Sequence, residues 1–229
     1  MKRSIVRNTL WNLFGIGIPL LLALFAIPIL INEAGLEKFG VISLIWLLIG
    51  YFSLLDMGIG RALTQRVSFL SKVVNDERIK KVISSGLFVL LLLGLFGGLL
   101  LLLTSRLLAF NVLNIANEIQ SDSYHALMVT ALIIPVTTLT NGYRGVLEAF
   151  SEFKTVSLIR IIHGSSNFLA PLVTVLFFNE SVTSIALSLA LSRLIVLFLF
   201  FWASSKILYC ALLQFDKAEI KYLFGFGSW

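Results

Sequence analysis

The stretch VISSGLFVLLLLGLFGGLLLLLTS (Val82–Ser105) decides the fold class, because it contains no charged residue and is long enough to cross a membrane. A bilayer core about 30 Å thick needs roughly 20 apolar residues in a helix. Five more runs of this kind lie along the 229-residue chain, and they are continuous rather than alternating, which argues against barrel strands. The six predicted spans are approximately Thr9–Ile31, Phe39–Met57, Val82–Ser105, Tyr124–Tyr143, Leu158–Phe178 and Val182–Ser204.

The composition indicates that lipid is the solvent for most of the chain. Hydrophobic residues make up 58% of the sequence and charged residues 13%, whereas a soluble domain has about 25% charged residues. A soluble fold of this size has too little interior to bury so much apolar surface. The net charge of +6 is spread over short segments between apolar runs, so we predict no nucleic-acid partner. The single Cys210 excludes an intrachain disulfide framework.

The basic residues predict the orientation. If Arg160 at the start of the fifth span is counted with the connection before it, fifteen of the 18 Lys and Arg residues lie in the N-terminal segment, in every second connection after it and beyond the last span. Lys38 and Arg106 lie in the other connections. Such an excess marks cytoplasmic segments, so we expect both termini in the cytoplasm. The run Thr9–Ile31 follows Lys2 and Arg3 as a signal peptide would, but it is too long for one, and we interpret it as a retained span.

Arg193 is the deepest charged residue in the predicted spans. It lies about 11 residues after the start of its helix, which is roughly 16 Å from that end and close to the bilayer midplane. Such a group usually faces the bundle interior or a water-filled cavity. We predict it as a substrate-cavity residue, and keep the alternative of a structural Arg paired with carbonyls or a carboxylate on a neighbouring helix.

Other polar residues recur at helical spacing. The strongest row lies in the fifth predicted span and contains Arg160, His163 and Asn167, and Asn12 belongs to a similar row in the first span. We predict these four as further substrate-cavity residues. Arg160 could also extend to the nearby interface, and His163 could either titrate near neutral pH or serve as a hydrogen-bonded packing residue.

Asp56 lies near the end of the second predicted span, before the basic segment Arg61–Lys81. It could end the helix beside Gly58 and Gly60 and pair with a basic residue, or it could serve in gating or ion coupling. The segment after it could form a short interfacial helix or a solvated connector.

Gly94 and Gly98 form a G-x-x-x-G pattern in the third span. Small residues at this spacing let two helices approach closely. Because this span is rich in glycine, we interpret the pattern as packing within the bundle rather than as self-association.

No pattern for bond-making chemistry occurs. The sequence has no H-E-x-x-H, G-x-x-x-x-G-K-[ST] or G-x-S-x-G motif and no paired-carboxylate cluster. The two histidines, His125 and His163, fall on opposite sides of the membrane in the predicted topology. We therefore predict no catalytic residue, no metal site and no cofactor, and favour a secondary transporter over an enzyme.

Four stretches of the chain resemble one family. They are RNTLWNLFGIGIPLLLALFAIPILINEAGLEKFGVISL (Arg7–Leu44), YFSLLDMGIGRALTQRVS (Tyr51–Ser68), NGYRGVLEAFSEFKTVSLIRI (Asn141–Ile161) and EIKYLFGFGSW (Glu219–Trp229). In this order they are similar to the oligosaccharide flippase (polysaccharide transporter) family of the MOP superfamily, which also includes the MATE exporters. No functional residue is carried over from the family.

The resemblance implies an all-α integral membrane protein, a six-helix bundle that corresponds to the N-terminal lobe of a MATE-like transporter. Family members move lipid-diphosphate-linked oligosaccharides to the outer leaflet of the bacterial cytoplasmic membrane by alternating access, for O-antigen, capsule or exopolysaccharide synthesis. They have about twice as many spans, so residues 205–229 are expected to be a cytoplasmic lead-in to a missing second lobe. A single lobe would need a second lobe or a second copy as partner.

Two alternatives remain at this stage. One is another MOP-superfamily exporter, with a drug or a peptidoglycan lipid precursor as cargo; a drug exporter is expected to carry deep acidic residues, whereas the deep charge here is that of Arg193. The other is a membrane enzyme of polysaccharide assembly, which would usually have a large outer loop with several charged catalytic residues.

Overall fold

A computed structural model describes residues 2–53, 56, 58–71, 76–205, 216, 219–222 and 225, with the side chains of residues 2–12, 53 and 76 outside the description. Every regular element in these ranges is helical, which confirms the all-α prediction. The helices are α1 (Lys2–Ala34), α2 (Leu36–Ser53), α3 (Ile59–Leu70), α4 (Asp76–Leu107), the π-helical turn η2 (Leu108–Val112), α5 (Asn117–Ala149), α6 (Phe153–Phe177) and α7 (Val182–Ser205).

Five helices of the described chain are long and apolar enough to cross a membrane, namely α1, α4, α5, α6 and α7. Each contains or closely matches one predicted span. The remaining predicted span, Phe39–Met57, corresponds to α2, which starts earlier and ends at Ser53. The six-helix bundle is therefore approximately confirmed.

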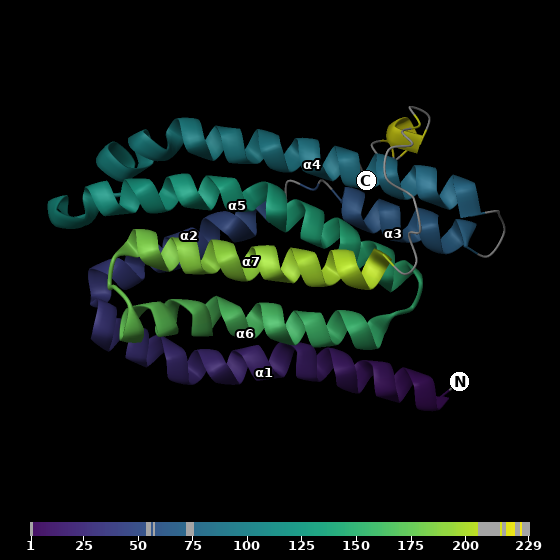
Figure 1. The fold of residues 1–229 in the computed structure, drawn as a ribbon, viewed down its shortest axis with the longest axis horizontal. Helices are drawn as coiled ribbons and strands as arrows, with labels where there is room; N and C mark the ends of the chain where they lie inside the picture. The colour runs from purple at the N-terminus through teal and green to yellow at the C-terminus, as the bar shows by residue number, and fades with distance from the viewer. Residues whose placement is uncertain are drawn as a thin grey trace.

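The long helices lie side by side in one layer (Figure 1). Their order across it is α1, α6, α7, α5 and α4. On a face of this layer, α2 packs mainly against α5, and α3 packs against α5 and α4. The N-terminus and the α3–α4 and α5–α6 connections lie at one end, which we call the basic end. The α1–α2, α4–α5 and α6–α7 connections lie at the opposite end.

A tight turn lies near the end of the second predicted span, whose residues 54, 55 and 57 are outside the described residues. Gly58 adopts a left-handed conformation with φ of 75°, which glycine reaches at little cost. Its N–H donates to Asp56 Oδ1 at 3.0 Å, a local turn that competes with helix continuation. A new helix, α3, starts directly after this turn at Ile59.

The helix after this turn is neither a solvated connector nor a helix on the membrane surface. Val67 and Leu70 of α3 are buried together with Ile79 and Val82 of α4 and Val146 of α5. The apolar face of α3 thus packs on protein, and its axis follows the long axis of the bundle (Figure 1).

The G-x-x-x-G pattern of α4 serves packing within the bundle, as the sequence predicts. A Cβ added at Gly98 would lie 2.6 Å from the carbonyl oxygen of Ala131, and one at Gly94 would lie 2.7 Å from Pro135 Cα. Both contacts belong to α5. The missing side chains therefore let the α4 and α5 backbones approach closely.

Large apolar side chains cover the outside of the bundle. On α1, Leu20, Leu24 and Phe25 are exposed, and α4 and α7 present similar rows, including Leu103 and Phe198. Contiguous apolar surface on this scale is not stable in water. The exposed faces therefore suit a hydrocarbon environment, in which helices satisfy their own backbone hydrogen bonds.

Candidate functional site

The side chain of Arg193 lies inside the bundle, on the buried face of α7. The residue is 7% exposed, and other residues on this face, among them Leu189, Val196 and Phe200, are also buried. Arg193 has no carboxylate within 4.0 Å among the described residues. The structural alternative with a carboxylate partner on a neighbouring helix therefore does not hold in this part of the chain.

Two neutral side chains of α6 contact this guanidinium. Arg193 Nη2 donates to Asn167 Oδ1 at 3.0 Å. Arg193 Nη1 lies 3.3 Å from His163 Nε2, and because a guanidinium can only donate, His163 Nε2 accepts and the proton of a neutral ring is on Nδ1. Neither partner neutralises the charge, so α7 and α6 are joined by hydrogen bonds that retain a buried positive charge.

A small polar cavity lies beside Arg193 at the junction of three helices. Its wall consists of Thr137, Thr140 and Asn141 of α5, His163 of α6, and Arg193 and Val196 of α7. The cavity offers about 10 Å³ to the centres of water molecules, which is room for about one water. Arg193 Nε is buried and has no hydrogen-bond partner among the described residues.

The threonines at this cavity already use their hydroxyl protons. Thr137 donates to Ile133 O at 3.1 Å, and Thr140 donates to Val136 O at 2.7 Å. Their oxygens can therefore only accept from a molecule in the cavity, while Arg193 Nε–H can donate to it. We call Arg193, His163, Asn167, Thr137 and Thr140 the central polar cluster.

The path from the opposite end toward this cluster is packed. Ala186, one turn into α7, is fully buried in an apolar cluster with Val41 and Ile45 of α2 and Ala126 of α5. The surface of α7 around Ala186 is therefore covered by neighbouring side chains.

Arg160 lies apart from the central polar cluster, toward the basic end. Its Nη2 donates to Glu148 Oε1 of α5 at 3.4 Å, and the same oxygen lies 3.5 Å from Arg144 Nε. These three residues form a cluster with one net positive charge. Sequence reasoning overlooked Glu148 here, although its spacing of four residues from Arg144 is a signal for an ion pair on a helix.

Asn12 lies in α1, and its side chain is outside the described residues. The next turn of α1 approaches α6, because a Cβ added at Gly15 would lie 3.5 Å from Arg160 Cδ. Farther along, a Cβ at Gly164 of α6 would overlap the ring of Pro19. The glycine and proline of α1 thus bring this helix against the polar row of α6.

Asp56 ends a turn in the structure. One carboxylate oxygen accepts from Gly58 N–H, and the other lies 3.2 Å from the place that a Cβ on Gly60 would occupy. This agrees with the hypothesis that Asp56 ends a helix beside two glycines. The ion pair with a basic residue, which that hypothesis included, does not occur among the described residues.

Asp122 is a structural carboxylate that the sequence did not reveal. It lies near the start of α5 and accepts bonds from Val182 N–H at 2.6 Å, Thr183 N–H at 3.0 Å and Ser181 Oγ at 2.8 Å. These donors are the free N–H groups and hydroxyls at the start of α7. The cap comes from about 60 positions away, so no local pattern could have shown it.

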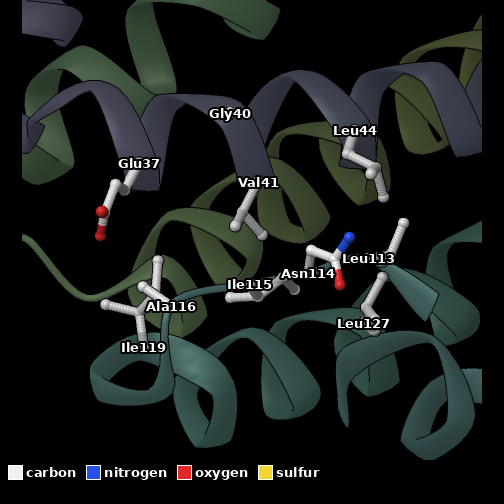
Figure 2. Close-up of a pocket in the computed structure, with 10 residues that line it drawn as sticks. All are labelled: Glu37, Gly40, Val41, Leu44, Leu113, Asn114, Ile115, Ala116, Ile119 and Leu127. Carbon is white, nitrogen blue, oxygen red and sulfur yellow. The ribbon is translucent and has the colours of Figure 1, made fainter. Parts of the chain in front are cut away.

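Two wider cavities lie away from the central polar cluster. One of about 390 Å³ lies between α2 and the connection into α5, where Val41 and Leu44 point toward Leu113 and Ile115 (Figure 2). The other, of about 450 Å³, lies between α3 and α5 near the basic end and includes Arg61 and Glu148. Arg160, one of the predicted site residues, is linked to the second cavity through its bond to Glu148.

With this geometry in view, comparisons identify the family. A family model described as "Polysaccharide biosynthesis protein" matches residues 35–229. The chain belongs to this family. A protein of Shigella flexneri, named as a candidate O-antigen transporter, is 30% identical over 226 residues, which are 99% of this chain and 53% of that relative. This member of the polysaccharide biosynthesis family thus spans about half the length of the curated relative that it matches.

Solved structures confirm the fold of this family member. A MOP superfamily transporter from Pyrococcus furiosus, described as having a binding pocket of reverse polarity that suggests a different function, aligns with a TM-score of 0.76 and 15% identity. A MATE protein in complex with MaD3S aligns with a TM-score of 0.81 and 18% identity. Each alignment covers 99% of this chain and 51% and 52% of the two relatives, respectively. The chain therefore has the fold of half a MOP transporter.

Proposed function

We propose that the chain is the N-terminal half of a carrier that moves lipid-diphosphate-linked oligosaccharides across the bacterial cytoplasmic membrane by alternating access. It would serve the synthesis of O-antigen, capsule or exopolysaccharide and would carry out no bond-making step. Membership of the polysaccharide biosynthesis family and the MOP fold support this proposal. The name of the Shigella flexneri relative supports the O-antigen class of cargo.

The single observation that carries the mechanism is the charge of Arg193, buried among neutral partners. A sugar diphosphate cannot cross hydrocarbon unaided, because its charges and hydroxyl groups would lose their hydration. A guanidinium near the midplane offers planar, charge-assisted hydrogen bonds to phosphate oxygens. For the MOP superfamily transporter from Pyrococcus furiosus, a binding pocket of reverse polarity has been taken to suggest a different function. In this chain, the buried charge of Arg193 is positive.

The present cavity is too small for a diphosphate, so transport requires the helices around it to separate. The cavity lies where α5, α6 and α7 meet. We propose that α6, which packs mainly on α1 and α7, moves relative to α5 to open a path toward Arg193. His163 and Asn167 would hold the guanidinium in place, and Asn12 would extend the polar wall on α1.

The other predicted residues receive roles toward the basic end. Arg160, with Glu148 and Arg144, would line the entrance used by the charged head of the substrate. Asp56 would serve as the joint at which α3 changes direction relative to α2, because its carboxylate holds the turn at Gly58. Such joints are a few residues between rigid elements that absorb changes in φ and ψ.

We place the protein in the cytoplasmic membrane as a multi-pass chain with both termini in the cytoplasm. The distribution of Lys and Arg supports this orientation. Because relatives have about twice the length, the active carrier would contain a second lobe or a second copy of this one.

Deletion of the gene in its host tests this function. We expect surface polysaccharide to be lost and lipid-linked oligosaccharide to accumulate in the cytoplasmic membrane, and both changes to be reversed by the wild-type gene. Loss of polysaccharide without the lipid-linked intermediate would instead indicate an enzyme of assembly. Unchanged surface polysaccharide would contradict the proposal altogether.

A further inference from the structure

A buried carboxylate lies in the chain after α7, where sequence reasoning predicted only a lead-in to another lobe. Glu219 is 4% exposed. It accepts bonds from Arg66 Nε at 3.1 Å and Nη2 at 3.2 Å. It also accepts bonds from Arg78 Nε at 3.3 Å and Nη2 at 3.2 Å. One carboxylate thus joins the end of α3 to the start of α4.

Three further contacts hold the same segment. The guanidinium of Arg66 lies 4.2 Å from the centre of the Tyr222 ring, within the range of a cation–π interaction. Asp216 N–H donates to Ser85 Oγ of α4 at 3.0 Å. Ile220 packs on the apolar cluster that α3 and α4 share. Charge, aromatic, backbone and apolar contacts therefore all converge on one surface.

The surroundings of Glu219 provide the charged partners and hydrogen bonds that a buried carboxylate requires. A carboxylate removed from water is costly unless opposite charges and hydrogen bonds surround it. Here the hydrogen-bonded Glu219 raises the pKa of Arg66, which keeps that partner charged. Two arginines on one carboxylate leave a net positive charge, and Arg78 remains half exposed to solvent.

This contact lies far along the chain from its partners. The helical turn Glu219–Tyr222 lies at the basic end, beside the ends of α3 and α4 (Figure 1). The helix that precedes it, α7, packs mainly against α5 and α6. The segment therefore adds a direct contact to α3 and α4, whereas α7 reaches these helices mainly through α5.

We propose that Asp216 and Glu219–Tyr222 form a strap, and that the Arg66 and Arg78 guanidinium groups with Ser85 are its docking site on α3 and α4. The partner that this surface fits is a segment of the same chain with one acidic residue followed by an aromatic residue three positions later. The strap makes α3, α4 and the polypeptide after α7 move as one body. This holds whatever cargo the carrier moves.

Limited trypsin digestion of the purified protein tests the strap, because Lys221 lies within Glu219–Tyr222. Cleavage there requires the strap to detach, so its rate follows the population of the open form. Glu219→Gln keeps the shape and removes the charge, and we expect cleavage to accelerate by on the order of 100-fold. Glu77→Gln removes an exposed carboxylate near the start of the same α4 and should leave the rate unchanged.

A double substitution separates the docking contact from general destabilisation. Because Arg66 contacts both Glu219 and the Tyr222 ring, Arg66→Gln combined with Glu219→Gln should be cleaved faster than either single variant, but by less than the product of the two single accelerations. Additive acceleration would overturn the proposal, and so would equal rates for Glu219→Gln and wild type. If Glu219→Gln does not accumulate, Ser85→Ala, which removes only the acceptor of Asp216 N–H, should accelerate cleavage severalfold, and unchanged cleavage would overturn the proposal.

Discussion

At the scale of single residues, Arg193 is costly to the fold. Its charge is buried, its described partners His163 and Asn167 are neutral, and its Nε has no partner among the described residues. A buried charge of this kind contributes less to stability than an apolar side chain of similar volume would. We therefore infer that Arg193 is present for its charge rather than for packing.

This inference predicts the sign of a stability change. Arg193→Met should leave the melting temperature of the purified protein unchanged or raise it, because removal of the unneutralised buried charge offsets the two hydrogen bonds that His163 and Asn167 lose. Arg66→Met is the matched control, because it deprives the buried Glu219 of one arginine and should destabilise by about 3 kcal/mol. Thermal unfolding monitored by Trp fluorescence compares the three proteins. Clear destabilisation by Arg193→Met would assign this residue a structural role instead.

The sequence predicted which polar residues lie deep, but not which of them meet. Depth follows from position along a helix, so the sequence places Arg193 near the midplane, and it groups His163 and Asn167 in one polar row of the fifth predicted span. The pairing of Arg160 with Glu148 and the cap that Asp122 gives to α7 depend on how helices are rotated against one another. Rotation is set by packing across the whole bundle, which no local pattern records.

At the scale of helices, close approach of α4 and α5 depends on two glycines. The α5 backbone fills the space in which side chains at Gly94 and Gly98 would lie. By contrast, Gly50 of α2 has nothing within 4 Å of the position of an added Cβ. The same residue type therefore serves packing in one helix and has no such purpose in the other.

Alanine substitution at Gly98 and at Gly50 should affect the free energy of unfolding differently. Gly98→Ala places a methyl group against the Ala131 carbonyl and should destabilise by about 1–3 kcal/mol through overpacking. Gly50→Ala should be neutral or stabilise by up to about 1 kcal/mol, because alanine has the higher helix propensity. Thermal unfolding in detergent measures both. Equal effects of the two substitutions would mean that α4 and α5 do not pack as described.

The long helices were predictable where hydrophobic runs are unbroken, whereas composition alone did not show the turn at Asp56 and Gly58. The Asp56 carboxylate accepts from the Gly58 N–H, and α3 starts directly after this turn. The signal was visible in the sequence as an acid followed by two glycines. Hydropathy gave more weight to the surrounding apolar residues than to this turn chemistry.

At the scale of the whole molecule, the alternation of charged connections agrees with the way the helices run. The N-terminus and the α3–α4 and α5–α6 connections share one end of the bundle (Figure 1), and these are the segments rich in Lys and Arg. At the opposite end, Lys38 is paired with Glu180 at 3.1 Å. The charge asymmetry of the sequence is thus an asymmetry of the folded bundle.

This asymmetry predicts the orientation in the membrane. Single cysteines in a Cys210→Ser background at Ser151, between α5 and α6, and at Asn179, between α6 and α7, should react from opposite sides. We expect a membrane-impermeant maleimide added to intact spheroplasts to label Asn179→Cys and to spare Ser151→Cys until the membrane is opened. Labelling of Ser151→Cys in sealed spheroplasts would reverse the proposed topology.

The proposed mechanism depends on Arg193 binding a phosphate-bearing cargo. The most direct test is to measure, in spheroplasts, the share of lipid-linked oligosaccharide that is exposed on the outer leaflet of the cytoplasmic membrane. Cells carrying Arg193→Gln should show this share reduced roughly 10- to 100-fold at equal protein level, the loss expected for one charge-assisted interaction. Arg193→Lys, which keeps the charge without the planar fork, should lie between Arg193→Gln and wild type. An outer-leaflet share in Arg193→Gln cells equal to that of wild type would contradict the account.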